Sequence, residues 1–547
     1  MSSRKVRQLP PRRVRPISRQ AVFNPSRGLN NYGAPNLIND KEWADLQNMQ
    51  FDESGIVRKR MGYDQYSANL TNARGLGSLN TVTLDQVLTV DGTTFKYTTG
   101  TSWTSNTSIT FTANKEVTFT QANENVYIWN GTEGGAKWTG STLTRPGTMP
   151  RASFSVWYKG YQVCSGVDTQ PHRVYFSRIS DESIFTNVGT EPQPSPNDAT
   201  QVPGATVFLG TGAEFIDVNP GDGDKVTGLG IFGDILVIFK EFSIYQFTLE
   251  ATGDVIAQPN LLSITKAAGC VSHKSIVPVE NDLYFLSREG VRVIGNEANF
   301  YDSIRTSLLS QPIQPIIDAI KSSEASKACG VYYNDEYILT IPDSSGTMNT
   351  TIVYNRIFRG WSKWTNCDTD SFLKFVDSSN NVLLLFLQDD GTKVQQFTPG
   401  VYSDDGQPID SYILSKVFDF GNPDITKYFV DLGLMFRTIS GEINIEVYTE
   451  GNVLFGGSVG LAGNPVVDGM GLTMLGYTVL GEGGGTGGTG EAFADEVRRV
   501  VINTNSTSIR FKISNNRNNE NFVLLGYIHA FYPYGHFLFD SANKIYL

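Results

Sequence analysis

Residues 86–103 read QVLTVDGTTFKYTTGTSW, and this stretch indicates the fold class. Two runs of alternating apolar and polar residues flank Asp91-Gly92, a pair that suits the tight turn of a β-hairpin. The same pattern returns at 117–131, 153–166, 226–248, 274–295, 328–343 with 350–365, and 372–397. About seven such units, spaced roughly 30 to 60 residues apart, are typical of a β-propeller with about 6–8 blades. A stacked pair of β-sandwiches is the competing architecture.

The composition favours a large all-β protein that is partly covered by neighbours. The chain has 547 residues, of which 40% are hydrophobic and 12% aromatic. Only 18% are charged, below the roughly 25% of an average soluble domain. A polar but weakly charged surface suits burial in an assembly.

The cysteines and the apolar runs indicate the compartment. Cys164, Cys270, Cys329 and Cys367 are scattered without a CxxC pair, which favours four buried free thiols and a reducing compartment. No run of 18 apolar residues and no signal peptide is visible, so we expect no membrane segment and synthesis in the cytoplasm.

Changes of pattern along the chain predict four regions. Residues 1–27 are expected to form a basic arm. Residues 28–70 are expected to pack on the propeller and to contain a short helix, because Asn39 and Asp40 could cap KEWADLQNM, with Trp43, Leu46 and Gln47 on one side. The propeller is assigned to 71–400, with a short helix within 302–327. A β-sandwich follows at 401–547, with a flexible glycine-rich loop at 481–490.

The first 20 residues are strongly basic. They hold seven of the 44 basic residues and no acidic one, which leaves 37 basic against 55 acidic residues in the rest of the chain, a formal charge of −18. Such an arm can bind an acidic partner or phosphate, or it can be a solvated tail. The candidate interaction residues are Arg4, Lys5, Arg7, Arg12, Arg13, Arg15 and Arg19.

Motifs for chemistry are sparse, and we expect neither an enzyme nor a bound cofactor. The four histidines have no metal-binding spacing. Asp217, Asn219, Asp222 and Asp224 place several oxygen ligands on one turn, which makes a weak calcium candidate beside the simpler reading of an Asx-rich turn. Tyr354, Trp361 and Trp364 could form a sugar-binding platform, but alternating aromatic residues favour blade core.

Two stretches carry a resemblance to a known family. Residues 28–63, GLNNYGAPNLINDKEWADLQNMQFDESGIVRKRMGY, combine a Gly-Leu-Asn opening and Ala34-Pro35 with VRKR at 57–60 and Gly62-Tyr63. Residues 172–187, HRVYFSRISDESIFTN, provide a second match in the same order, with Val174 to Ser177 as a strand and Phe185 as an anchor.

In these features the chain resembles the tail nozzle proteins of short-tailed phages, also called tail tubular protein B or packaged-DNA stabilisation protein. The resemblance covers about residues 25–400 at the level of pattern. It implies a homohexameric virion ring below the portal and adaptor that extends the DNA channel, retains packaged DNA and opens for ejection. Partners would be the portal–adaptor ring, other tail proteins and double-stranded DNA, bound without sequence preference. The arm and the C-terminal region lie outside the resemblance.

Three alternatives remain at this point. The chain could be a receptor-binding or glycan-degrading tail protein, because carboxylates for glycoside hydrolysis can come from distant strands. It could be a hub or collar component of a long-tailed phage. It could also be a cellular propeller scaffold that binds peptides.

Overall fold

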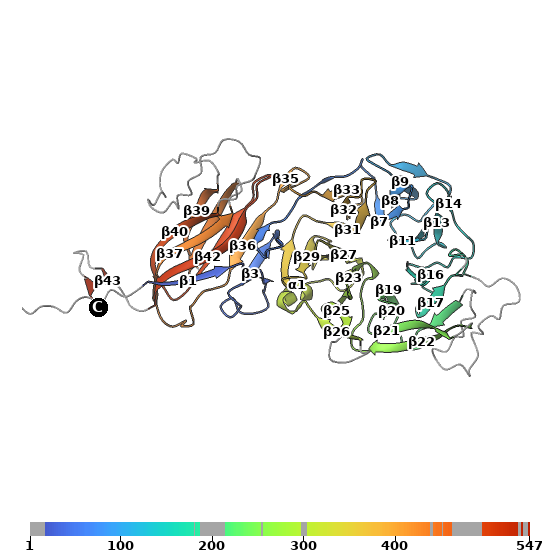
Figure 1. Ribbon diagram of the computed structural model, residues 1–547, viewed down its shortest axis with the longest axis horizontal. Coiled ribbons are helices and arrows are strands. Elements are labelled where there is room, and N and C mark those ends of the chain that lie inside the picture. Colours follow the sequence, from blue (N-terminus) through green and yellow to red (C-terminus); the bar gives the residue numbers. More distant parts are fainter. Residues whose placement is uncertain are drawn as a thin grey trace, which may run out of the picture. The chain divides into compact units, whose positions relative to one another are not determined.

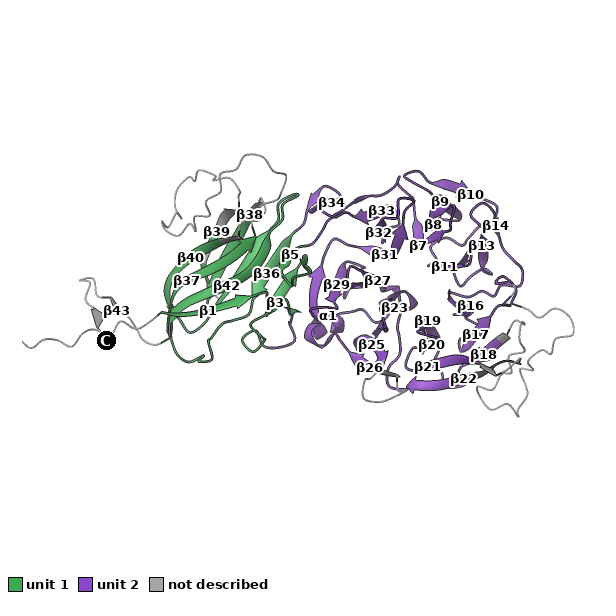
Figure 2. Cartoon of the chain, in the orientation of Figure 1, with its two compact units in different colours: residues 1–28, 34–59, 410–547 green, residues 29–33, 60–409 purple. Residues whose placement is uncertain are grey.

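The computed structural model describes residues 17–179, 181–185, 214–252, 255–296, 304–437, 441–450, 452–461, 495–533, 538–539 and 545–546. The chain divides into two units (Figure 2). Unit 1 contains residues 1–28, 34–59 and 410–547, and unit 2 contains residues 29–33 and 60–409. The two-residue strand β2 (Gly28–Leu29) lies where unit 1 gives way to unit 2.

In unit 2 the hairpin pattern forms seven blades of four antiparallel strands within the described ranges, arranged around a common axis (Figure 1). Five blades are separate four-stranded sheets, and the last two belong to larger sheets. The first three blades are β7 (Ala73–Asn80), β8 (Asp85–Asp91), β9 (Thr94–Thr98) and β10 (Thr104–Asn106); β11 (Thr118–Ala122), β12 (Asn125–Trp129), β13 (Ala136–Trp138) and β14 (Leu143–Thr144); and β15 (Phe154–Tyr158), β16 (Tyr161–Ser165), β17 (Arg173–Phe176) and β18 (Glu214–Asp217). The next two are β19 (Val226–Phe232), β20 (Ile235–Lys240), β21 (Ile244–Thr252) and β22 (Val255–Thr265); and β23 (Val277–Val279), β24 (Asp282–Ser287), β25 (Gly290–Asn296) and β26 (Ile304–Leu308). The last two are β27 (Cys329–Tyr333), β28 (Glu336–Ile341), β29 (Thr350–Asn355) and β30 (Gly360–Trp364); and β31 (Thr369–Val376), β32 (Val382–Gln388), β33 (Val394–Phe397) and β6 (Tyr63–Gln65).

The sheets close into a ring through their innermost strands. Strands β7, β11, β15, β19, β23, β27 and β31 contact one another in this order, and β31 contacts β7 again. The seventh blade takes its outermost strand, β6, from the start of unit 2, where Tyr63 pairs with Phe397 of β33. The all-β propeller predicted from the sequence is therefore confirmed, with seven blades, and β6 adds residues that precede the predicted range.

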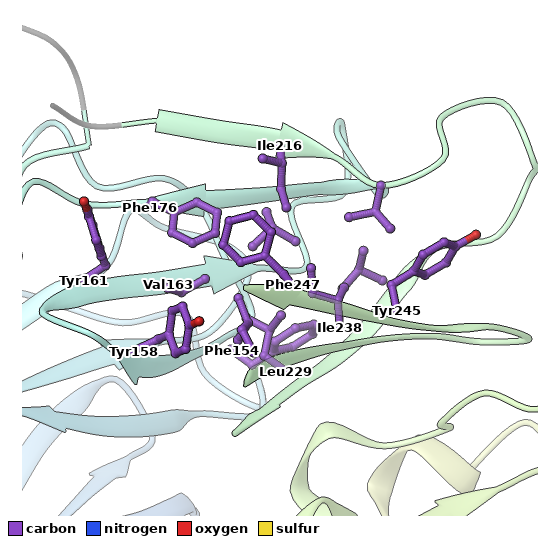
Figure 3. Close-up of a cluster of buried hydrophobic side chains, with 14 residues drawn as sticks. Phe154, Tyr158, Tyr161, Val163, Phe176, Ile216, Leu229, Ile238, Tyr245 and Phe247 are labelled. Carbon is purple, nitrogen blue, oxygen red and sulfur yellow. The ribbon is translucent and has the colours of Figure 1, made fainter. Parts of the chain in front are cut away.

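The propeller core consists of apolar clusters between neighbouring blades. Figure 3 shows the cluster between the third and fourth blades, where the rings of Phe176 and Phe247 lie 5.3 Å apart. Gly77 of β7 sits close to the second blade, because a Cβ there would lie 2.4 Å from the side chain of Phe119. All four cysteines are buried free thiols, as the sequence predicted.

Short helices decorate this ring. The 3-10 helix η1 (His273–Ser275) precedes β23, and η2 (Gln311–Ile313), α1 (Gln314–Asp318) and η3 (Ala325–Lys327) join the fifth and sixth blades. The short helix predicted within 302–327 is thus confirmed as the five-residue α1, which starts with Pro315 in its first turn. The apolar periodicity suggested helix from residue 304 onward, and this part of the prediction is wrong, because residues 304–308 form β26 and complete the fifth blade. A further pair of short strands, β34 (Ser403–Asp404) and β35 (Gln407–Pro408), extends the seventh blade beside β6.

Unit 1 is built from two sheets. One contains β1 (Ser18–Phe23), β4 (Met49–Phe51), β5 (Val57–Lys59), β37 (Lys427–Arg437), β40 (Asp495–Ser506) and β42 (Val523–Tyr532). The other contains β3 (Glu42–Gln47), β36 (Ser411–Ser415), β38 (Gly441–Thr449), β39 (Asn452–Leu461) and β41 (Ile509–Asn515). Trp43 of β3 packs against Tyr527 of β42 at 5.9 Å between ring centroids. The predicted C-terminal β-sandwich is confirmed, and residues from the N-terminal part of the chain complete it. The short pair β43 (Leu538–Phe539) and β44 (Ile545–Tyr546) follows β42.

The helix predicted after Asn39-Asp40 is wrong, because this segment is strand β3. Asn39 does cap a turn, with its Oδ1 accepting the Lys41 N–H at 3.0 Å. Trp43 and Leu46 are both buried, although a regular strand would turn residues three apart to opposite faces. A register shift between Trp43 and Asp45 inserts an extra residue against β36. This β-bulge restores both side chains to one face and imitates helical spacing.

In the part of the chain that the structure describes, no helix has the length and hydropathy that a membrane-spanning segment requires.

Candidate functional site

Most of the basic arm falls outside the described residues. Arg4, Lys5, Arg7, Arg12, Arg13 and Arg15 belong to residues 1–16, which lie there, as does the glycine-rich loop 481–490. Arg19 is described: it lies in β1, opposite Ala530 of β42, with its side chain exposed. The proposed interaction role of these residues stays a prediction.

The four calcium candidates are occupied by partners from the protein itself. Both carboxylate oxygens of Asp217 accept hydrogen bonds from Arg173 at 2.7 and 2.8 Å. Asp222 binds the buried ammonium of Lys240 at 2.6 Å and the amide of Asn219 at 2.8 Å. Asp224 accepts the hydroxyl of Ser243 at 2.8 Å. The structure brings Asn219 and Asp222 together, and within its described ranges no group of three or more His, Cys, Asp or Glu side chains could hold a metal ion.

The end of the family-like stretch 28–63 closes the propeller. The guanidinium of Arg60 donates two hydrogen bonds to the carboxylate of Asp404, at 2.9 and 2.6 Å, and another to the carbonyl of Thr365 at 2.9 Å. Tyr63 donates its hydroxyl to the carbonyl of Asn366 at 2.6 Å. Gly62 leaves no room for a side chain, because a Cβ there would lie 2.0 Å from the carbonyl oxygen of Ser403. We call Arg60, Gly62, Tyr63, Ser403 and Asp404 the closure clasp.

The charges of the clasp are buried. The side chains of Arg60 and Asp404 are 0% and 3% exposed. Burial by itself lowers the pKa of the guanidinium, but nearby Cys367 and the Asp404 carboxylate outweigh it and raise that pKa above its ordinary value. A bidentate pair with further hydrogen bonds is the geometry in which buried charges compensate each other. The clasp thus ties the beginning of unit 2 to its end.

The other half of the motif VRKR anchors unit 1. The ammonium of Lys59, in β5, is buried and donates to the side chain of Asn515 at 2.8 Å and to the carbonyl of Arg517 at 3.2 Å. Two consecutive basic residues therefore serve two different units.

The second family-like stretch also has a structural role. Residues 173–176 form β17, one residue earlier than the predicted strand 174–177. Phe185, the predicted anchor, packs edge-on against Trp129 at 6.0 Å between ring centroids. Arg173 of the same strand stacks over Phe215 at 3.7 Å while it binds Asp217. This stretch therefore stabilises the third blade and helps to hold it against the second.

A cavity of about 870 Å³ opens where the innermost strands begin. Thr118, Phe154 and Val226, the first residues of β11, β15 and β19, line it together with the segment 317–326. We call it the mouth cavity. Its volume lies within the range of ligand sites in proteins.

Lys274 also lines this cavity. It precedes β23 of the fifth blade, donates to the carbonyl of Asp370 in the seventh at 2.9 Å, and lies 3.5 Å from the carboxylate of Glu116 beside the second. Burial by itself lowers the pKa of this ammonium, but Glu116 and Asp370 raise it above its ordinary value. The ion pair with Glu116 and the hydrogen bond to Asp370 therefore link three blades at the mouth and offset the charge of Lys274 there.

His273 stands beside Lys274 as a neutral ring. Burial, together with the Lys274 charge, lowers its pKa to about 4. Its Nδ1 accepts the N–H of Leu229 at 3.4 Å, and the ring stacks on Phe154 at 4.7 Å. This arrangement holds the third, fourth and fifth blades together and leaves the imidazole committed to packing.

The aromatic trio is core, which confirms the interpretation that the pattern favoured. Tyr354, Trp361 and Trp364 are 6%, 1% and 0% exposed. Trp361 donates its indole N–H to the carbonyl of Leu309 at 3.1 Å. These rings stabilise the sixth blade and present no platform for a sugar.

Sequence reasoning missed the clasp and the Lys274 network. Arg60 and Asp404 are 344 residues apart, and Lys274 meets groups 96 residues away. The one signal for the clasp in the sequence is the run of basic residues before Gly62-Tyr63. A pattern of charges does not predict that these basic residues are buried.

The chain was compared with known proteins at three levels. No protein-family model and no curated protein matches it. Among solved structures it is similar to YCF48 from Cyanidioschyzon merolae, with 8% identity and a TM-score of 0.35 over 62% of this chain and 99% of that one. It is also similar to the WD40 β-propeller domain of Doa1, with 9% identity and a TM-score of 0.35 over 62% and 98% of the two chains. A third is BamB from Moraxella catarrhalis, with 9% identity and a TM-score of 0.33 over 61% and 97%. At these identities and scores the likenesses say nothing about function.

Proposed function

We propose that this protein is a structural subunit of a phage tail nozzle, a homohexameric ring that extends the portal–adaptor channel, retains packaged DNA and opens for ejection. It acts in the virion without catalysis or cofactor. The resemblance of residues 28–63 and 172–187 to tail nozzle proteins suggests this role.

The closure clasp is the observation that carries the proposal. The long segment of unit 2 runs from Arg60 to Ile409, and Arg60 at its start binds Asp404 near its end through two buried hydrogen bonds. A pull on these two connections acts on residues that hold each other, so the blades between them bear less of the load. A nozzle subunit must withstand the pressure of packaged DNA, and this arrangement suits that task.

Charge gives further support. Beyond residue 20 the chain carries 37 basic against 55 acidic residues. An acidic ring repels the phosphate backbone, so DNA can slide through a channel without sticking. The basic arm would then bind carboxylates of a neighbouring ring or subunit.

The test measures mass and shape. Purified protein, alone and mixed with portal–adaptor complexes of short-tailed phages, is examined by light scattering and negative-stain imaging. A six-fold ring, free or formed on the complex, is the expected result. A monomer that ignores the complexes would refute the nozzle assignment.

The mouth cavity favours a second candidate, a propeller scaffold that binds a peptide. Its lining carries lysines as well as carboxylates, among them Lys115, Lys225, Asp168 and Asp318. A scaffold of this kind would remain a monomer in the same experiment and would bind a peptide at the mouth.

A further inference from the structure

His529 lies on the inner face of the first sheet of unit 1 without a hydrogen-bond partner. It belongs to β42, opposite Gln20 of β1 on one side and Leu432 of β37 on the other. The residue is 1% exposed, and neither ring nitrogen has a partner among the described residues. Buried polar atoms are nearly always paired, so an orphaned imidazole calls for an explanation.

Aromatic rings enclose this histidine. Phe418 lies 4.3 Å from it, Phe420 5.4 Å, Tyr527 5.6 Å and Phe511 6.0 Å, measured between ring centroids. Rings of this kind fit a neutral imidazole and offer a charged one no carboxylate. Protonation would therefore require the surroundings to change.

One wall of this enclosure is conformationally strained. Phe420 has a φ of 53° and is followed by Gly421 with a φ of 77°. A positive φ is unusual for a bulky residue and persists only where the surrounding packing enforces it. The turn that contains Phe420 is thus held in place by its packing and can yield when that packing changes.

The carboxylate of Asp40 raises the pKa of His529, against the effect of burial. Both of its oxygens have partners within the protein. Its Oδ2 accepts the side-chain amide of Gln20 at 3.0 Å, and its Oδ1 lies 2.9 Å from the ammonium of Lys416. Tyr527 donates its hydroxyl to the carbonyl of the same residue. The packed elements carry further charged groups, which are Asp419 in the strained turn, Arg19 on β1, Lys427, Asp431 and Arg437 on β37, and Arg510 and Lys512 on β41.

Strand β1 is attached through few side chains. Val22 is the one residue of the strand that is fully buried. Apart from its backbone pairing with β42, β1 is tied by the hydrogen bond from Gln20 to Asp40. Loss of this bond would leave an edge strand with little apolar burial to hold it.

We propose that His529 is an acid-triggered latch on the N-terminal strand. When the ring takes up a proton, it draws the carboxylate of Asp40 away from Gln20, the turn around Phe420 opens, and β1 leaves the sheet. The device frees the segment that carries the basic arm, and it does not depend on the nozzle assignment.

The direction of the pH dependence follows from the histidine. Burial lowers the pKa of His529 to about 3, although Asp40 acts in the opposite direction. The ordinary value is about 6.5. Above that pH the ring is neutral in both the open and the closed state, and the latch is at full strength. As the pH falls from about 6.5 toward 3, the open state binds a proton that the closed state excludes, so the ratio of open to closed rises by up to about tenfold per pH unit.

The experiment follows amide hydrogen exchange in the full chain between pH 7.5 and pH 4.5, corrected for the intrinsic pH dependence of exchange. Peptides from β1 and β42 are compared with peptides from the propeller. In the wild type we expect protection in β1 to fall by up to about 100-fold at pH 4.5, while the propeller peptides keep theirs. In His529→Phe, which fills the site without titrating, β1 should keep its protection. His172→Gln, in unit 2, is the matched control and should behave as the wild type does.

A second variant and a direct titration keep the test decisive if His529→Phe folds poorly. His529→Leu is smaller than the phenylalanine variant and also cannot take up a proton, so the acid response of β1 should be lost in it as well. In the wild type, NMR signals of the His529 ring should change over the same pH range in which β1 opens. Acid loss of β1 protection that persists in both variants, or that spreads equally over all strands of unit 1, would overturn the latch.

Discussion

At the scale of single residues, the closure clasp shows how burial changes the role of a charge. Arg60 and Lys59 are adjacent basic residues that would be placed on the surface by composition alone, yet both are fully buried. Each meets a preformed set of oxygen acceptors from a distant part of its own unit. Such residues are difficult to replace, because a buried charge without its partner is costly.

Asp404→Asn tests this directly. The substitution keeps the shape but leaves the Arg60 guanidinium buried without a carboxylate, so we expect the propeller to lose about 3 to 5 kcal/mol of stability. Thermal unfolding, followed by calorimetry, measures the loss.

The neighbouring residue supplies the control. Asp405 pairs with Lys393 at 2.6 Å, but these side chains are 38% and 31% exposed. Exposed pairs contribute about 0 to 1 kcal/mol, so Asp405→Asn should have a small effect. Equal losses in the two variants would contradict the role of the clasp.

At the scale of elements, the structure depends on which strand stands beside which. The hairpins of the propeller are local, and the turn at Asp91-Gly92 lies where the sequence predicted it. Strand β6 is different, because it pairs with β33 from the other end of the unit. Gly62 permits this closure by letting its backbone approach Ser403.

Gly62→Ala should therefore weaken the seventh blade. The added Cβ would lie 2.0 Å from a backbone oxygen, and overpacking of this kind costs about 1 to 3 kcal/mol. Hydrogen exchange of peptides from β33 and β6 should rise more than exchange elsewhere in the propeller.

Gly100→Ala is the matched change, since a Cβ at that position meets nothing within 4 Å. It should alter stability by no more than about 0.5 kcal/mol. If Gly62→Ala proved equally mild, the closure would not depend on this close approach.

At the scale of the whole molecule, charge is distributed unevenly between the arm and the rest. The first 20 residues carry seven positive charges, and the remainder carries a formal charge of −18. At low salt the arm therefore attracts negatively charged partners, and the rest of the chain repels them.

Replacement of the six basic residues before residue 17 by Gln keeps the length of the arm and removes its charge. Because the rest of the chain repels phosphate, we expect any non-specific affinity for duplex DNA to fall strongly. The slope of log K against log salt should also become shallower, by about 0.9 for each phosphate that the arm no longer neutralises. Fluorescence anisotropy over a salt series measures both quantities. An unchanged slope would place the DNA-binding residues elsewhere in the chain.

The local features of this protein follow from its sequence. Alternating residues and turn pairs specify hairpins because the side-chain period of a strand and the backbone needs of a tight turn are local properties. These features predicted the propeller, the strands of the sandwich, the buried thiols and the aromatic core of the sixth blade.

The remaining features depend on contacts between segments that are distant in the sequence. Trp43 and Leu46 looked helical until the bulge opposite β36 was known. The carboxylate that binds Arg60 and the aromatic rings that enclose His529 come from segments that lie far apart in the sequence. Burial and hydrogen-bond partners depend on which distant segments meet, and the energies that bring them together are shared across the whole core. A pattern along the sequence therefore does not predict this burial or these hydrogen-bond partners.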